Sequence, residues 1–470
     1  MSSARGRTRV PARSAAALAA VVVAGGALTA CGSGSGDGGD GTLTVWSMEN
    51  QSDRVAAAQR IADQFTAQTG VKVKIVGLDE DQFSQLVTSA AAAGNLPDAI
   101  GGLSLTGVNE MAVNDLVDTD AAAAVVKDLG AGTFSGRALD MDTSGGKQLA
   151  VPSDGWPQLL VYRKDLFTKA GLPAPDSFDK IRQAAQKLNS RDVAGISIAT
   201  DPGDAFTQQT FEDFALGNGC QLVDRTGKVT LDSPACVNTF SLYSDLVHSY
   251  SVPGAQNVDS TRATYFAGKA AMTVWSSYLL PQLAGLQKDA APSCPQCQAD
   301  PTFLAKNTGF VTAIKGPDGS AAQNFGELGS WVITQGDRAA NAQKFVSYML
   351  DQGYAGWLGL APQGKIPART GTASEPGKFT KAWSALPVGT DAKKPLSAVY
   401  PAEVIQALQT SLDSFQQWGI PQGQGGLAGA SLAELPVPKA VSAMTGGTVD
   451  PSGAAKQASA AVQDIQKSLK

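Results

Sequence analysis

Groups that commonly perform acid–base or nucleophilic chemistry are scarce in this chain. It contains one histidine, His248, on the face of a predicted helix, so no pair of histidines is present to hold a metal. No Gly-x-Ser-x-Gly nucleophile motif stands at a predicted strand end. Asp and Glu are frequent near predicted strand ends, however, and paired carboxylates can cleave glycosides. We therefore expect binding without catalysis, cofactor or metal, and keep an exported glycoside-acting hydrolase as the alternative.

The N-terminus has the pattern of an export signal. Four arginines precede an apolar run over residues 15–30 that is too short for a permanent membrane span. The run ends in Leu28-Thr29-Ala30-Cys31, which resembles the lipobox where bacterial lipoproteins are acylated on the cysteine. We expect a signal peptide over 1–30, then the lipid-bearing Cys31 and a flexible Gly-, Ser- and Asp-rich linker, together 31–41. These features predict an extracytoplasmic protein anchored to the cell membrane by lipid.

Four further cysteines would meet an oxidising environment outside the membrane, where disulfides are the usual outcome. Three pairings are possible. We favour the two local closures, Cys220 with Cys236 around a turn-like Asp-Arg-Thr-Gly-Lys segment, and Cys294 with Cys297 in a Cys-Pro-Gln-Cys motif. A redox or zinc role for the second pair is the alternative, although a structural zinc site needs four Cys or His ligands.

Charge and length narrow the class of protein. The formal net charge is −5, and loss of the arginine-bearing signal would make the chain more acidic, so nucleic-acid binding is not expected. The length of 470 residues allows two sizeable lobes, each with its own core.

Strand and helix patterns alternate along the first part of the chain. Strands are predicted over 42–46 and 71–76 and at 99–100, with helices over 55–65 and around Phe83 between them. This order predicts a parallel sheet covered by helices on both faces. A second α/β pattern starts at Leu149, with a strand over 159–162 and helices over 164–171 and 178–188. Further strands are predicted over 195–199, 271–275, 310–314 and 331–334, and further helices over 237–249, 341–350, 403–415 and 452–469. Two such units place a ligand cleft between facing strand ends.

Several motifs occur in an order that resembles one protein family. They are the strand, helix and Phe-x-x-x-Thr-Gly segment over 42–70, Leu96-Pro97-Asp98-Ala99, the stretch from Tyr162 to Pro173, Phe266 to Thr273, and Gly364-Lys365-Ile366-Pro367. Together they resemble the sugar-binding branch of the extracellular solute-binding proteins of ABC importers, which includes maltose-binding protein. The resemblance covers nearly the whole chain after the linker.

The resemblance implies an α/β fold of the type II periplasmic-binding-protein kind, with two hinged lobes and a cleft between them. We expect lobe 1 over 42–152 and 307–350, and lobe 2 over 153–306 and 351–470, the last part including C-terminal helices. The chain would cross between lobes near 151–154 and again near Lys306.

The implied function is capture of a mono- or oligosaccharide outside the membrane and its delivery to ABC permease subunits by lobe closure. The partners would be the sugar, the permease and the membrane, and the protein would be a monomer. A sensory surface lipoprotein of the same fold is a second alternative.

A sugar presents hydroxyls at its rim and apolar C–H groups on its face, so its site needs polar side chains beside aromatic rings. Positions that match the family's ligand-facing loops supply both. The acids at 79–81 could instead complement a helix dipole, and each Trp could instead be a core residue. The predicted ligand-binding residues are Trp46, Glu49, Asn50, Glu80, Gly102, Ser104, Asp154, Trp156, Trp275, Tyr278 and Trp331.

Overall fold

The computed structural model of the protein describes residues 41–469. The expected signal peptide, the lipid anchor on Cys31 and all of the linker except Gly41 lie outside these residues. Among residues 41–469, no helix is both long enough and apolar enough to cross a membrane.

Three parallel strands form the first part of the sheet. The central strand β1 (Leu43–Ser47) pairs with β2 (Val73–Gly77) on one side and β3 (Ala99–Ser104) on the other. Helix α1 (Ser52–Thr69) connects β1 to β2 and buries Ala58, Ile61, Ala62 and Phe65 on one face. It ends at Gly70, whose φ of 75° suits glycine at a helix C-terminus. The strand, helix, strand order predicted for this part is therefore confirmed.

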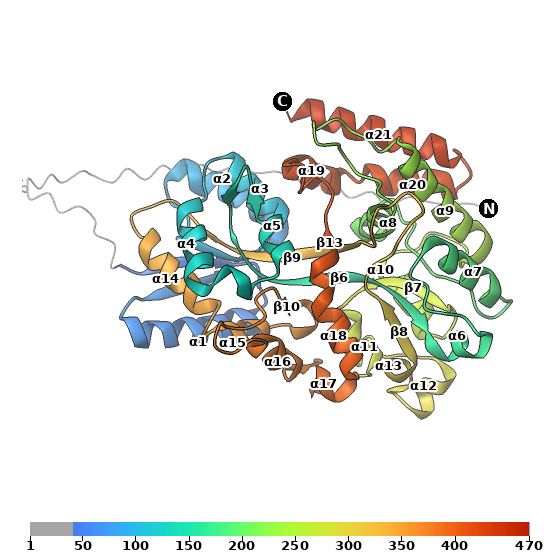
Figure 1. Ribbon diagram of the computed structural model, residues 1–470, viewed down its shortest axis with the longest axis horizontal. Helices are drawn as coiled ribbons and strands as arrows, with labels where there is room; N and C mark the ends of the chain where they lie inside the picture. Colours follow the sequence, from blue (N-terminus) through green and yellow to red (C-terminus); the bar gives the residue numbers. More distant parts are fainter. Residues whose placement is uncertain (1–40, 470) are drawn as a thin grey trace, which may run out of the picture. The chain divides into compact units, whose positions relative to one another are not determined.

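Two long strands extend the sheet across the molecule (Figure 1). The first half of β6 (Val151–Arg163) pairs antiparallel with β9 (Asn324–Ile333), which itself pairs antiparallel with β3. From Gln158 onward β6 instead pairs with β7 (Met272–Ser276) and β8 (Thr308–Val311). The short strands β10 (Ile366–Pro367) and β13 (Phe415–Gln416) pair with β6 and β9, respectively. One continuous strand thus carries the chain from one group of strands to the other.

The second crossing lies on β9, later in the chain than the expected position near Lys306. Lys306 belongs to α13 (Phe303–Asn307), and the β8 strand that follows still pairs with the second half of β6. The chain returns to the first group of strands only where β9 meets β3. The expected strand over 195–199 forms only isolated bridges, Ala194 to Ala270 and Ser197 to Thr273.

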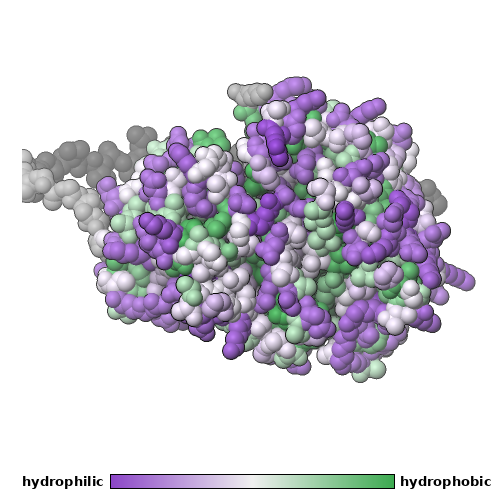
Figure 2. Space-filling view, in the orientation of Figure 1, coloured by the Kyte–Doolittle hydropathy of each residue, from purple (hydrophilic) through white to green (hydrophobic). Residues whose placement is uncertain are grey.

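A helical layer covers the second group of strands. Helix α7 (Phe178–Leu188) has the predicted bounds, and the C-terminal α21 (Pro451–Ser468) packs against α9 (Pro234–Tyr250) and α20 (Pro436–Thr445). Their shared core includes Phe211, Phe240, Tyr243, Val441 and Val462, all almost completely buried. Figure 2 shows hydrophilic side chains over much of the visible face, and of the described large hydrophobic residues only Leu86, Val113 and Leu469 are exposed.

The remaining elements complete the two helical layers and their connections. The helices are α2 (Phe83–Ala93), α3 (Leu105–Val113), α4 (Thr119–Leu129), α5 (Gly136–Met141), α6 (Lys164–Ala170), α8 (Ala205–Gly217), α10 (Val258–Phe266), α11 (Leu279–Leu283), α12 (Pro295–Ala299), α14 (Ala339–Met349), α15 (Tyr354–Leu358), α16 (Lys378–Ser384), α17 (Leu396–Val399), α18 (Ala402–Thr410) and α19 (Gly425–Glu434). The short strands β4 (Thr143–Ser144) and β5 (Lys147–Gln148) form one hairpin, and β11 (Pro387–Val388) and β12 (Lys394–Pro395) form another. Helix α15 packs against α1, so this part of the segment expected in lobe 2 lies beside the first group of strands.

The structure contains two disulfides, in the pairing favoured from the sequence. Cys220 is bonded to Cys236 in the first turn of α9, and the loop between them turns at Asp224, whose carbonyl accepts from Gly227 N–H. Cys294 is bonded to Cys297 at the start of α12. All four cysteines are buried, so both bonds fasten loops onto the core.

Candidate functional site

A cavity of about 230 Å³ lies where the strands of the two groups meet. Its walls come from the residues after β1, from the C-terminal half of β3, and from the middles of β6 and β9. The first turn of α1, the turn before α2, and the segments after β7 and before β10 complete them. The parallel strands β1 and β3 bring their carboxyl ends to the same edge of the sheet, and β6 and β9 run past that edge. The lining residues are Met48, Glu49, Arg54, Glu80, Gly102, Ser104, Asp154, Gly155, Trp156, Tyr278, Glu327, Leu328, Gly329, Gly364 and Lys365.

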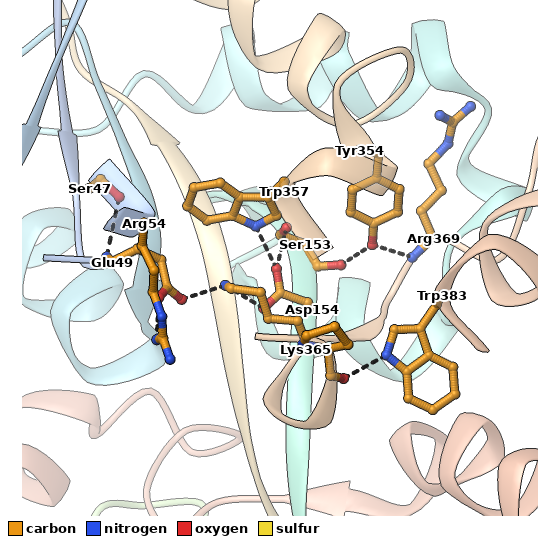
Figure 3. A network of polar contacts seen from close by, with 11 residues as sticks. Ser47, Glu49, Arg54, Ser153, Asp154, Tyr354, Trp357, Lys365, Arg369 and Trp383 are labelled. Carbon is orange, nitrogen blue, oxygen red and sulfur yellow. Dashed lines mark hydrogen bonds and ion pairs between the residues drawn. The ribbon is translucent and has the colours of Figure 1, made fainter. Parts of the chain in front are cut away.

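A buried lysine connects two carboxylates on one side of this cavity (Figure 3). Lys365 Nζ lies 2.8 Å from Glu49 Oε1 and 3.1 Å from Asp154 Oδ1. Glu49 also accepts from Arg54 in the first turn of α1, at 2.7 Å between Nη1 and Oε2. Because the side chains of Lys365 and Asp154 are each only 4% exposed, the two charges depend on each other for compensation.

Neighbouring residues fix the position of Asp154. Its Oδ2 accepts from Trp357 Nε1 at 2.8 Å and from Ser153 Oγ at 2.6 Å. Lys365 Nζ lies 4.4 Å from the centre of the Trp357 ring, a distance at which the ring face attracts the ammonium. Tyr354 donates to the carbonyl of Ser153 and accepts from the backbone N–H of Arg369. Both oxygens of Asp154 therefore have partners, which hold the side chain in one orientation.

The charges of this network persist across neutral pH. Burial alone would raise the pKa of Glu49, but the ion pairs with Lys365 and Arg54 dominate and lower it to about 2. Burial alone would lower the pKa of Lys365, but Asp154 and Glu49 raise it above its ordinary value. Glu49 is accordingly a carboxylate and Lys365 an ammonium, and neither is suited to proton transfer near pH 7.

Two more carboxyls line the cavity without such partners. Glu80 stands in the turn before α2, and Glu327 lies on β9. Burial raises the pKa of Glu327 to about 8, and the nearby Glu80 charge adds to the shift. The pKa of Glu80 is raised as well, by loss of water and by the charges of Asp81, Asp79 and Glu49.

Two aromatic rings complete the wall on the side of β6 and β7. The rings of Trp156 and Tyr278 meet edge to face, with centroids 6.2 Å apart, and both residues remain partly exposed. Trp156 also packs against Phe325 at 5.8 Å between centroids. Gly364 lies so close to the Tyr278 ring that any side chain at this position would collide with it. The two rings are thus supported from behind and keep surface free toward the cavity.

The structure brings most of the predicted ligand-binding residues together. Those that line the cavity are Glu49, Glu80, Gly102, Ser104, Asp154, Trp156 and Tyr278. Trp46 and Asn50 do not line the cavity: Trp46 lies within β1 and packs against a small core that includes β3 residues, and Asn50 is exposed.

Two predicted residues belong to the core instead. Trp331 is 1% exposed and stacks beside Trp357, with 4.9 Å between ring centroids, over Gly101, which has no side chain to occupy that space. Trp275 is 6% exposed, and its Nε1 donates to the carbonyl of Val258 at 3.0 Å. Both rings are used for packing, so the prediction that they face the ligand is not supported by their positions.

Three charged residues of the cavity were not predicted from the sequence. Lys365 stands in the Gly-Lys-Ile-Pro segment that contributed to the family resemblance, and this was a usable signal. Glu327 is the one charged residue within the ten residues of β9, and a lone charge in a buried strand indicates a special environment. Arg54 looked like an ordinary surface residue of a first helical turn.

A second cavity adjoins the first. It has a volume of about 550 Å³, and Arg54 and Tyr278 line both. Its other walls carry the side-chain amides of Gln51, Gln282, Gln287 and Gln363, which can both donate and accept hydrogen bonds.

Comparison with known proteins agrees with this geometry. Residues 49–356 match the family described as bacterial extracellular solute-binding protein. The chain is 29% identical over 326 residues to the putative ABC transporter periplasmic-binding protein YcjN of Escherichia coli K12, across 67% of this chain and 70% of that protein.

Solved structures of similar fold have low sequence identity to this chain. The sugar-binding protein MalE of Xanthomonas citri aligns with a TM-score of 0.69 and 16% identity, covering 90% of this chain and 97% of that one. The GacH receptor of Streptomyces glaucescens, solved unliganded and with acarbose, aligns with a TM-score of 0.64 and 19% identity, covering 91% and 98%. The expected two-lobe α/β fold is confirmed by these likenesses.

Proposed function

Because the chain belongs to the family of bacterial extracellular solute-binding proteins, whose members serve ABC transporters, we propose that it captures a carbohydrate and delivers it to a permease. The observation that carries this proposal is the cavity that the Trp156 and Tyr278 rings line together with polar and charged side chains. This combination suits a ligand with hydroxyls at its rim and apolar C–H groups on its face.

The size of the site supports a small sugar. The first cavity, at about 230 Å³, is smaller than the roughly 300–1,000 Å³ of drug-sized ligand pockets and suits about one sugar ring. The adjoining cavity beyond Arg54 and Tyr278 offers amide groups to a further unit. The proposed ligand is therefore a mono- or short oligosaccharide. Among proteins of similar fold, MalE of Xanthomonas citri is a sugar-binding protein, and the GacH receptor of Streptomyces glaucescens was solved in complex with acarbose.

Delivery would follow from closure of the two lobes on the ligand. Glu49 and Ser104 approach the cavity from the β1 and β3 side, whereas Tyr278 follows β7 in the other group of strands. A ligand that contacts both sides binds the closed form more tightly and shifts the population toward it. A nearly complete shift requires about 5.5 kcal/mol of differential affinity, which hydrogen bonds and stacking from both sides can supply. The permease would then recognise the closed form.

The N-terminal features complete the proposal. The signal peptide over 1–30 would export the chain, and acylation of Cys31 would hold it at the cell membrane near the permease. The Gly-rich linker that follows would let the folded part move while it stays attached.

A titration screen tests the proposed function directly. Isothermal titration calorimetry of the protein against neutral and amino mono- and oligosaccharides should identify at least one that binds at a single site. Cleavage products in the same samples would instead favour a glycoside-acting hydrolase. If no carbohydrate binds and amino acids or peptides do, the carbohydrate proposal is wrong while the family assignment stands.

A further inference from the structure

The charged groups of the first cavity divide into two sets. Lys365 and Arg54 are the cations, and they compensate Glu49 and Asp154 through contacts of 2.7 to 3.1 Å. This set is balanced, with two positive and two negative side chains. Any charge that remains in the cavity must come from the other lining residues.

Glu80 and Glu327 are the acids among the lining residues that lie outside this balanced set. Within residues 41–469, the structure gives neither carboxyl a hydrogen bond or an ion pair with another side chain or with the backbone. Glu80 comes from the turn before α2 and Glu327 from the middle of β9. Because the two carboxyls belong to different elements, a single local turn or helix cap does not account for their presence together at the cavity. Loss of water raises the pKa of both; the Glu80 charge adds to the shift at Glu327, and the charges of Asp81, Asp79 and Glu49 add to the shift at Glu80.

We propose that the ligand carries a protonated amino group, which Glu80 and Glu327 bind together, so that the substrate class is amino sugars or short oligosaccharides that contain them. This inference rests on the proposed carbohydrate function. An ammonium donates up to three hydrogen bonds, and its positive charge favours the carboxylate form of both residues, which a neutral hydroxyl does not do. The nearby aromatic surface of Trp156 and Tyr278 favours the same class, because ring faces attract cations as well as C–H groups.

The unpaired carboxyls also indicate which part of the ligand is recognised. The balanced set around Lys365 can bind hydroxyls as donor and acceptor groups, without regard to charge. Glu80 and Glu327 would then distinguish an amine from the hydroxyl or acetamide at the same ring position. A site discriminates strongly when the wrong ligand leaves the polar or charged groups of the site without hydrogen-bond partners.

A matched series of sugars tests this inference in the full chain. D-Glucosamine, D-glucose and N-acetyl-D-glucosamine share one ring and differ in a single substituent, and the galactose series and the corresponding disaccharides repeat the comparison. In any series that binds, calorimetry should show that the amino sugar binds about 10- to 100-fold more tightly than the sugar with a hydroxyl or N-acetyl group at the same position. Equal or tighter binding of the neutral members overturns the inference and leaves the proposed function intact. Absence of binding by every sugar overturns both.

Charge-removing variants locate the effect. Glu327→Gln and Glu80→Gln keep the side-chain size, and each should lower the affinity for the amine about ten-fold and reduce its preference over the hydroxyl sugar. Glu403→Gln makes the same charge change as a control, because Glu403 is exposed and lines neither cavity. Thermal melting identifies any variant that fails to fold. If one of the two cavity variants does not fold, the affinities of the other one test the inference. An undiminished preference in a folded variant of either cavity residue contradicts the inference.

Discussion

Lys365 Nζ lies 2.8 Å from Glu49 Oε1, and this contact joins the turn after β1 to the segment before β10. The same ammonium lies 3.1 Å from Asp154 on β6. One buried lysine therefore holds three distant parts of the chain at the edge of the cavity. The polar wall of the site exists only because these segments meet there.

Replacement of Lys365 by Met should destabilise the protein strongly. The change leaves Glu49 with Arg54 alone and Asp154 without a cation, and breaking a buried ion pair in this way costs about 3–5 kcal/mol. Urea unfolding followed by circular dichroism measures the loss. Lys74→Met serves as the control, because Lys74 is exposed and has no ion pair among the described residues. A loss no greater than that of the control would show that the network contributes little.

Stability should decline as the pH rises from about 5 to 8. Burial raises the pKa of Glu212 to about 8 and of Asp213 and Asp142 to about 7, so each binds a proton more tightly in the folded chain than in the unfolded one. The contribution of these three protonated carboxyls to the free energy of unfolding is complete below the ordinary carboxyl pKa of about 4, and it is lost as the pH rises past the raised pKa values.

The variant Glu212→Gln tests this dependence. The amide oxygen can still accept from the Trp418 N–H, which Glu212 Oε1 does at 2.6 Å, and no proton is required. We expect the variant to be more stable than the native chain at pH 8 by at least about 1 kcal/mol, and less so at pH 5. Unfolding curves at several pH values provide the measurement. Parallel curves for the two proteins across this range would refute the explanation.

Replacement of Trp156 by Ala should weaken ligand binding about ten-fold or more without unfolding the protein. The ring borders the cavity, and loss of an aromatic stacking surface removes about 0.5–1.5 kcal/mol beyond the lost contact area. Calorimetry with a binding sugar gives the affinity, and Trp156→Phe should retain most of it. Unchanged affinity in the Ala variant would mean that the ligand does not contact this ring.

Replacement of Cys31 by Ser should release the protein from the membrane fraction. Cys31 is the residue that we propose to be acylated, and the hydroxyl of serine cannot replace its thiol there, so the exported chain would lose the proposed anchor. Fractionation of cells that carry either form, followed by immunoblotting, distinguishes the two. Sedimentation of the Ser variant with membranes would disprove the anchor.

Elements with a clear period could be predicted from the sequence. The helix predicted over 178–188 matches α7 because its apolar residues recur at helical spacing. The full length of β6 could not be predicted, since Pro152, Gly155 and Pro157 are typical of breaks in a strand. This part of β6 remains a strand because it pairs with β9, with a register shift between Pro152 and Asp154.

The candidate site was only partly predictable, for a related reason. Strand ends and the family resemblance indicate Glu49 and Asp154, because both stand close to elements that local patterns reveal. The partner of both carboxylates, Lys365, comes from a segment whose return to the sheet depends on the whole fold. Residue type alone could not separate Trp156, at the cavity, from Trp331, in the core, because tryptophan serves both purposes.

Small-angle X-ray scattering of the protein with and without a sugar that calorimetry shows to bind tests the central claim most directly. Closure of two lobes around the ligand predicts a smaller radius of gyration at saturation, and no such change with a sugar that does not bind. An identical scattering profile in the presence of saturating bound sugar would contradict capture by closure.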